Sequence, residues 1–189
     1  KYTYPNNAYI VVIGDVSFKA VKKSISEKFG VWKKGKVVEN GVPVLTPNVG
    51  LTEVNFIDLP TATQSSIQIT NNVDLKMKDE DYFAALMAND ILGGGGAGYL
   101  FKNLREDKGY TYGAYSSIGS NRYGVSKFRA GAKVRNMVTD SAVSEIIKEI
   151  SKIRFEMVDS ELLKNAKAKY VGNFIRQSEN PQTIAGYAL

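Results

Sequence analysis

Cysteine and histidine are both absent from this sequence of 189 residues. Zinc in proteins is usually held by these two residue types, so a zinc site here would need carboxylates alone, which zinc rarely accepts. The same absence excludes Ser-His and Cys-His nucleophile pairs and acid–base catalysis by histidine. We therefore expect no metal ligands in this chain and no complete hydrolytic centre of these classes.

Long apolar runs are lacking as well. The longest, residues 8–13 (AYIVVI), is far shorter than the roughly 20 residues that a membrane-spanning helix needs. There is no initiator methionine and no leader-like start, so we expect the chain to be a piece of a longer one. Hydrophobic residues make up 43% and charged residues 23%, values typical of a folded globular domain, so neither disorder nor a membrane span is expected.

Negative charge is in shorter supply than positive charge. The 25 Lys and Arg outnumber the 19 Asp and Glu, which gives a formal net charge of +6. Such a balance is found in proteins that bind nucleic acid or acidic partners, and also in a solvated surface with a basic linker. Because no aromatic RNA-binding motif or recognition helix accompanies the charge, we favour the solvated surface and expect no nucleic acid partner.

The apolar pattern predicts a mixed order of strands and helices. Strands are expected at residues 8–13, 51–58, 64–70, 110–118 and 125–134. Helices are expected at residues 18–29, 79–93, 97–108 and around 143–153, then after Asp159 as N-cap and from Pro181. This order is not a regular alternation of strand and helix, so the predicted fold class is α+β: an antiparallel β-sheet with helices packed on one face.

Residues 33–50 look like a connection between domains. They contain prolines and glycines but no apolar period, a composition typical of a linker. We therefore divide the chain into residues 1–35, a linker at 36–50, and a second α+β domain at 51–189. Because Leu189 ends a helix-like stretch, we expect the second domain to be truncated.

The stretch GGGGAGYLFKNLREDKGYTY (93–112) is the most distinctive in the chain. Its glycines satisfy G-x-G-x-x-G, but a dinucleotide fingerprint follows a strand, whereas this run follows a predicted helix. A P-loop is excluded because Tyr99 stands where the lysine is needed. Two interpretations remain open: a flexible joint between helices, or a backbone that lets a ligand or a partner domain approach closely.

Arg105 and Tyr112 lie on either side of Gly109, which is expected to end a helix. If the chain turns there, the guanidinium and the phenol could converge in one cleft and hold a carbonyl oxygen or an oxyanion. From spacing alone we favour the simpler arrangement, in which Arg105 is exposed beside Glu106 and Asp107 and Tyr112 packs on the sheet.

Residues 92–117 (LGGGGAGYLFKNLREDKGYTYGAYSS) closely resemble the second-domain signature of the insulinase/pitrilysin family of zinc metallopeptidases and their mitochondrial-processing-peptidase-like relatives. That signature is a Leu-Gly-Gly-Gly turn, a short helix and then L-R-E-x-x-G-x-x-Y. Residues 4–32 are similar to the strand and helix that close the preceding domain, and residues 158–174 to the helix after the last strand pair. The chain departs from the pattern at 97–100 (AGYL), where family members commonly have Ser-Ser/Arg-Leu.

The resemblance implies that residues 1–35 are the C-terminal strand and helix of a preceding domain. It further implies a clamshell enzyme in which one half holds zinc through H-x-x-E-H and a distant glutamate. The other half supplies an arginine and a tyrosine to the substrate, which by matched position are Arg105 and Tyr112. A glycine-rich stretch associated with substrate handling corresponds to Gly93, Gly94, Gly95 and Gly96.

On this resemblance the chain is expected to be the non-catalytic, substrate-binding portion of a zinc metalloendopeptidase, inactive alone. It would carry no cofactor, with zinc in another domain or subunit, and its partners would be that unit and a peptide or small-protein substrate. The bacterial periplasm or cell envelope is favoured over the cytoplasm. One alternative is a non-enzymatic scaffold or assembly subunit of the same fold, and another is a binder of anionic ligands or nucleic acid.

Overall fold

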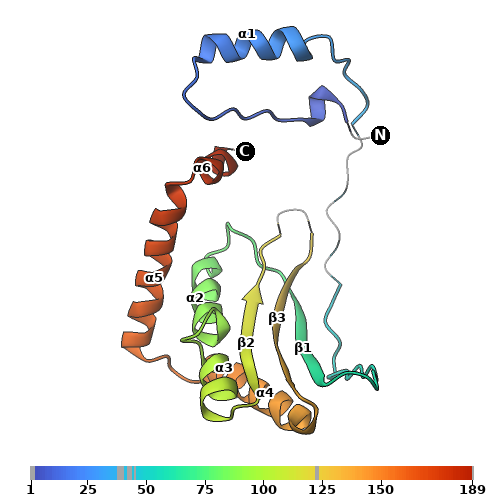
Figure 1. Cartoon of the computed structure of the whole chain (residues 1–189), viewed down its shortest axis with the longest axis vertical. Helices are drawn as coiled ribbons and strands as arrows, with labels where there is room; N and C mark the ends of the chain where they lie inside the picture. The colour runs from blue at the N-terminus through green and yellow to red at the C-terminus, as the bar shows by residue number, and fades with distance from the viewer. Residues whose placement is uncertain (1–2, 38–40, 42–43, 45, 122–123, 189) are drawn as a thin grey trace. The chain divides into compact units, whose positions relative to one another are not determined.

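The computed structural model describes residues 3–37, 41, 44, 46–121 and 124–188 (Figure 1). The chain divides into two compact units. One comprises Lys1–Gly41 together with Lys169–Leu189, and the other comprises Val42–Ala168. The domain boundaries at residues 35 and 50 stay a prediction.

The larger unit is built on a three-stranded antiparallel sheet. Its strands are β1 (Gln64–Val73), β2 (Thr111–Ile118) and β3 (Ser126–Arg135), in the order β1-β3-β2. The register places Ile67 opposite Ala132 and Ile69 opposite Ala130. These are the three strands predicted at 64–70, 110–118 and 125–134. The predicted hairpin connection at 119–124 falls partly on residues 122–123, which lie outside the described residues.

Helices cover one face of this sheet. They are α2 (Tyr82–Gly93), α3 (Tyr99–Phe101), which continues into the π-helical segment η2 (Lys102–Asp107), and α4 (Thr139–Phe155). Alternate β3 residues face the helices, and the core forms where they pack against Leu100, Leu104 and Ile146. Burial of such side chains is the main driving force for folding. The α+β class with helices on one sheet face, as predicted, is therefore confirmed.

The turn between the short helix and β2 follows the predicted chemistry. Gly109 has φ +61°, the left-handed conformation in which a side chain is strained, and it follows the last helical residues directly. The winding differs from the α-helix predicted at 97–108, because the hydrogen bonds join residues more than four apart. The Lys108 N–H donates to the Asn103 carbonyl oxygen at 3.0 Å, and the Tyr110 N–H donates to the Leu104 carbonyl oxygen at 2.8 Å. The wider turn leaves Asn103 buried, and its side-chain amide donates to carboxylates of α4, those of Glu145 and Glu149.

The remaining helices match their sequence signals. Helix α1 spans Phe18–Phe29, with Gly30 at its C-cap. Helix α5 spans Ser160–Ser178, and the Leu162 N–H donates to the Asp159 side chain at 2.9 Å, as expected for an N-cap. Helix α6 spans Pro181–Ala188. In the part of the chain that the structure describes, no helix is both long and apolar enough to cross a membrane.

Two predicted strands are wrong. Residues 8–13 and 51–58 have no strand structure, and their large apolar side chains are exposed, from Val11 at 42% to Ile57 at 89%. A strand needs a neighbouring strand to satisfy its backbone N–H and C=O groups. Neither segment has such a neighbour among the described residues, so an apolar run alone was not sufficient evidence for a strand.

Candidate functional site

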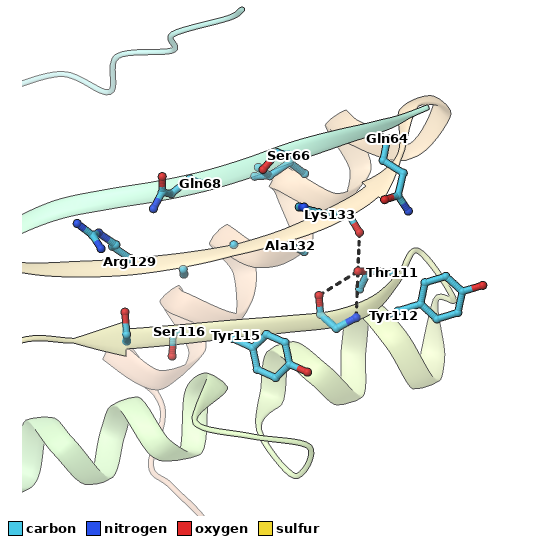
Figure 2. Close-up of a pocket in the computed structure, with 15 residues that line it drawn as sticks. Gln64, Ser66, Gln68, Thr111, Tyr112, Tyr115, Ser116, Arg129, Ala132 and Lys133 are labelled. Atoms are coloured by element: carbon cyan, nitrogen blue, oxygen red, sulfur yellow. Dashed lines mark hydrogen bonds between the residues drawn. The ribbon is translucent and has the colours of Figure 1, made fainter. Parts of the chain in front are cut away.

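The sheet face opposite the core formed with α2, α3 and α4 carries the candidate site. An open groove of about 730 Å³ runs over all three strands, with polar side chains along it (Figure 2). Strand β1 contributes Ser66 and Gln68, β3 contributes Arg129 and Lys133, and β2 contributes Tyr112 and Tyr115. Helices α2, α3 and α4 pack at the other side or the edge of the sheet, so within this unit these helices leave the face open.

A β-bulge determines where Tyr112 points. Thr111 pairs with Val134, but Ala114 pairs with Ala132, so Tyr112 and Gly113 together oppose one residue of β3. A bulge of this kind changes the direction of a side chain relative to its strand. Tyr112 is 86% exposed as a result, and in Figure 2 its hydroxyl points away from the sheet at the end of the groove. This exposure differs from the arrangement favoured from spacing, in which Tyr112 packs on the sheet.

The Thr111 side chain supports the bulge. Its hydroxyl accepts from the Gly113 N–H at 3.1 Å and lies 2.6 Å from the Lys133 carbonyl oxygen, to which it donates (Figure 2). These bonds satisfy backbone groups that the irregular pairing would otherwise leave without partners.

We expect Thr111→Val to destabilise the protein by about 1–2 kcal/mol, because Val keeps the shape but leaves the Gly113 N–H and the Lys133 carbonyl without that hydroxyl. Urea denaturation measures the loss, and faster hydrogen exchange at the Gly113 amide would locate it. Thr70→Val is the matched control: Thr70 is exposed on β1, and its change should stay within about 0.5 kcal/mol. Equal effects of the two substitutions would contradict a supporting role for the Thr111 hydroxyl.

Arg105 is linked to the groove by two aromatic residues, Phe101 and Tyr115. Its guanidinium carbon lies 4.7 Å from the centroid of the Phe101 ring, a cation–π arrangement. The Phe101 and Tyr115 ring centroids are 6.3 Å apart, and Tyr115 lines the groove. No hydrogen bond joins Arg105 to Tyr112 among the described residues. The convergence of these two groups on one ligand therefore stays a prediction.

The glycine run has two different environments. Gly93 is buried at the end of α2, and a Cβ placed there would lie 2.5 Å from the Ser116 backbone nitrogen of β2. Gly94 and Gly96 are exposed, and Gly95 is half-buried with a φ of 155°. The close approach at Gly93 is therefore to the chain's own strand. A Cβ at the exposed Gly94 would lie 2.6 Å from the Asp90 Cα of its own helix, whereas the atoms nearest to one at Gly96 are 3.8 Å away. The substrate-handling role of Gly93–Gly96 stays a prediction.

Several groove residues were missed by the sequence reasoning, among them Tyr115, Arg129 and Lys133. The contact of Phe101 with Arg105 beside the groove was missed as well. The signal for the basic pair was present in KFRAGAKVR (127–135), where positive and small or apolar residues alternate. That alternation predicts a strand with one solvent-exposed face and one buried face. Tyr115 carried no comparable signal, because a bulge before it changes the alternation along β2.

Zinc does not fit this chain. Among the described residues no group of three or more Asp or Glu side chains could hold a metal ion, and the whole sequence contains no His or Cys. The side chains of the groove instead present hydrogen-bond donors and positive charge.

Solved structures of other proteins share this fold. A peptidase M16 inactive domain from Pseudomonas fluorescens aligns with a TM-score of 0.71 and 22% identity, over 84% of this chain and 37% of that chain. A protease from Helicobacter pylori aligns with a TM-score of 0.66 and 19% identity, over 92% of this chain and 42% of that chain. The periplasmic protease PqqL from Escherichia coli aligns with a TM-score of 0.60 and 12% identity, over 92% and 19% of the two chains.

The chain thus spans less than half the length of each of these proteins. A comparison with curated protein sequences finds no match. The sequence model of the family described as Peptidase M16 inactive domain, however, matches residues 1–170. The chain therefore belongs to the peptidase M16 family, as an inactive domain, in agreement with the insulinase-like resemblance of its glycine, arginine and tyrosine motif.

Proposed function

We propose that this chain is the substrate-binding, non-catalytic portion of an insulinase-like zinc metalloendopeptidase. A peptide would lie in the open groove, and zinc would be held by another domain or by a partner subunit. The observation that carries the proposal is the exposed phenol of Tyr112, turned outward by the bulge at the end of a groove lined with polar side chains.

The role proposed for Tyr112 is donation of a hydrogen bond from its hydroxyl to a peptide carbonyl oxygen that gains negative charge during cleavage. A phenol is a good donor for this purpose, and a donor already in position stabilises developing charge strongly. The Tyr112 side chain is 86% exposed and its hydroxyl has no hydrogen-bond partner within the described part of the chain, so that hydroxyl is available to a ligand.

Arg105 would contribute in a different way. Its guanidinium carries five donors and packs on the Phe101 ring, and it forms no ion pair among the described residues. We propose that it anchors a second peptide carbonyl or a nearby carboxylate. Gly96 is exposed and has no atom nearer than 3.8 Å to an added Cβ, so it would let a peptide pass close to the backbone.

Reconstitution tests this function. The zinc-bearing companion is to be identified by its H-x-x-E-H motif, in the same gene or a neighbouring one, and assayed on a quenched fluorescent peptide of mixed sequence. We expect this chain to raise kcat/KM of the companion at least tenfold, because binding and orientation of the peptide depend on the groove. A complex that forms with no gain in cleavage would favour the alternative, an assembly subunit of the same fold.

We also propose a location in the bacterial cell envelope. The support is the fold shared with a periplasmic protease from Escherichia coli. Cell fractionation of the source organism, with an antibody against the chain, tests this proposal.

A further inference from the structure

The open face of the sheet has an unusual charge pattern. Four of the five outward-facing positions from 127 to 135 on β3 are basic: Lys127, Arg129, Lys133 and Arg135, all exposed. The fifth is Gly131. The residues between them face the core, where Ala130 and Val134 are buried. The positive charge is therefore concentrated along the middle strand of the sheet.

No acidic side chain balances this row within the sheet. The sequences of β1, β2 and β3 contain no Asp or Glu. None of the four cations forms an ion pair among the described residues, and the Arg135 guanidinium donates a long hydrogen bond, 3.5 Å, to the Gly109 carbonyl oxygen. On β1 the neighbouring outward residues are uncharged hydrogen-bonding groups, including Ser66 and Gln68. Unpaired positive charge over a polar groove is complementary to an acidic ligand.

The spacing of the row matches an extended peptide. Outward side chains on a strand recur every second residue, about 6.8 Å apart, and a peptide lying extended over the strand presents its own side chains with the same period. Gly131 interrupts the row at its centre, where a Cβ would meet the Ile67 carbonyl oxygen. The β1 backbone therefore leaves no room for a side chain at this position, and Gly131 lines the groove between Arg129 and Lys133.

We propose that this face selects acidic peptides: an extended segment whose carboxylate side chains, at alternate positions, pair with the β3 cations. The inference rests on the proposed function and names the substrate class of the same groove. Arg129 and Lys133, which line the groove, would be the central specificity-determining residues. Lys127 and Arg135 would extend the contact at either end.

Binding of labelled peptides to the whole 189-residue chain tests the selectivity. The probe is a peptide of roughly nine residues with Glu at alternate positions, and the comparison is the same peptide with Gln in place of every Glu. At low salt we expect the Glu peptide to bind at least tenfold more tightly, with a preference that falls as salt is raised. The variant Arg129→Gln/Lys133→Gln should lose at least fivefold in affinity for the Glu peptide and little for the Gln peptide.

The matched control is Lys164→Gln/Lys167→Gln, which removes the same charge from exposed positions on α5. It should leave both affinities unchanged, and thermal denaturation should give both double variants the wild-type midpoint. Equal binding of the two peptides would overturn the selectivity but leave peptide binding intact. Binding of neither peptide would overturn the groove function itself. A single-stranded oligonucleotide that binds as tightly as the Glu peptide would also overturn the proposal, because the face would then attract any polyanion.

Discussion

Tyr112→Phe is expected to lower kcat of the assembled peptidase at least tenfold, with little change in KM and none in stability. The substitution removes only the hydroxyl from a side chain that is 86% exposed, so packing in this domain is unaffected. Removal of one donor to a developing oxyanion typically costs ~3–4 kcal/mol of transition-state stabilisation, and this cost is the upper limit that we expect for the loss in kcat. An interaction made only in the transition state lowers kcat and leaves substrate binding almost unchanged.

The measurement needs steady-state kinetics on the chain assembled with its zinc-bearing companion. Tyr187→Phe is the matched control: Tyr187 is also exposed, at 61%, and its ring stacks on Phe174 of α5, so the loss of its hydroxyl should leave kcat unchanged. An increase in KM alone would assign Tyr112 to ground-state binding. An unchanged kcat would remove the proposed role and favour the assembly subunit.

Gly93→Ala is expected to reduce the free energy of unfolding by about 2–3 kcal/mol. The added Cβ would lie 2.5 Å from the Ser116 nitrogen, 2.8 Å from the Ser116 Oγ and 2.9 Å from the Leu100 Cδ1. The Ser116 nitrogen belongs to β2, where the backbone cannot move without disturbing the sheet, and Leu100 is fully buried. Urea or thermal denaturation measures the loss.

Gly96→Ala is the matched control from the same glycine run. The atoms nearest to a Cβ added at Gly96 belong to the Phe101 ring, at 3.8–3.9 Å, which is an ordinary contact distance. The free energy of unfolding should therefore change by less than about 0.5 kcal/mol. The pair also separates the two interpretations of the run. If the exposed glycines handle substrate, Gly96→Ala lowers activity while stability is retained. If both substitutions are equally tolerated in folding, the packing argument for Gly93 is wrong.

The positions of the helices were predictable because each helix satisfies its hydrogen bonds within a single segment, although the π-helical winding at Lys102–Asp107 was not predicted. Helix α1 was predicted at its observed bounds, Phe18–Phe29, and Asp159 was identified as the N-cap of α5 from its position before an apolar stripe. Gly109 was predicted to end the short helix because the left-handed conformation favours glycine. These signals are local, so the sequence contains them in full.

The strands were predictable only where partners exist. The pattern at 64–70 and the pattern at 51–58 are both strand-like, yet only the first is paired, because β3 lies beside it. Pairing depends on which segments meet in space, and a strand signal does not say which neighbour will be present. The exposed apolar side chains at 8–13 have the same explanation.

The candidate site was also predicted in part. The motif led to Arg105 and Tyr112, and the family assignment of the chain is now shown by the match over residues 1–170. The sequence motif did not reveal that Arg105 packs on Phe101, that a bulge turns Tyr112 outward, or that Arg129 and Lys133 share the open face. These facts depend on the register of β2 against β3, which is a long-range property.

By itself the sequence determined what this chain is unable to do and which family it resembles: without histidine or cysteine it holds no zinc site of the usual kind. Its local patterns also predicted where the helices lie, the bounds of α1 and the end of the short helix at Gly109, but not the π-helical winding of Lys102–Asp107. Only the tertiary structure decided which strands pair, why Gly93 has no room for a side chain, and which side chains gather on the uncovered sheet face. The physical reason is that helix ends depend on neighbours along the chain, whereas strand pairing and close packing depend on residues far apart in sequence.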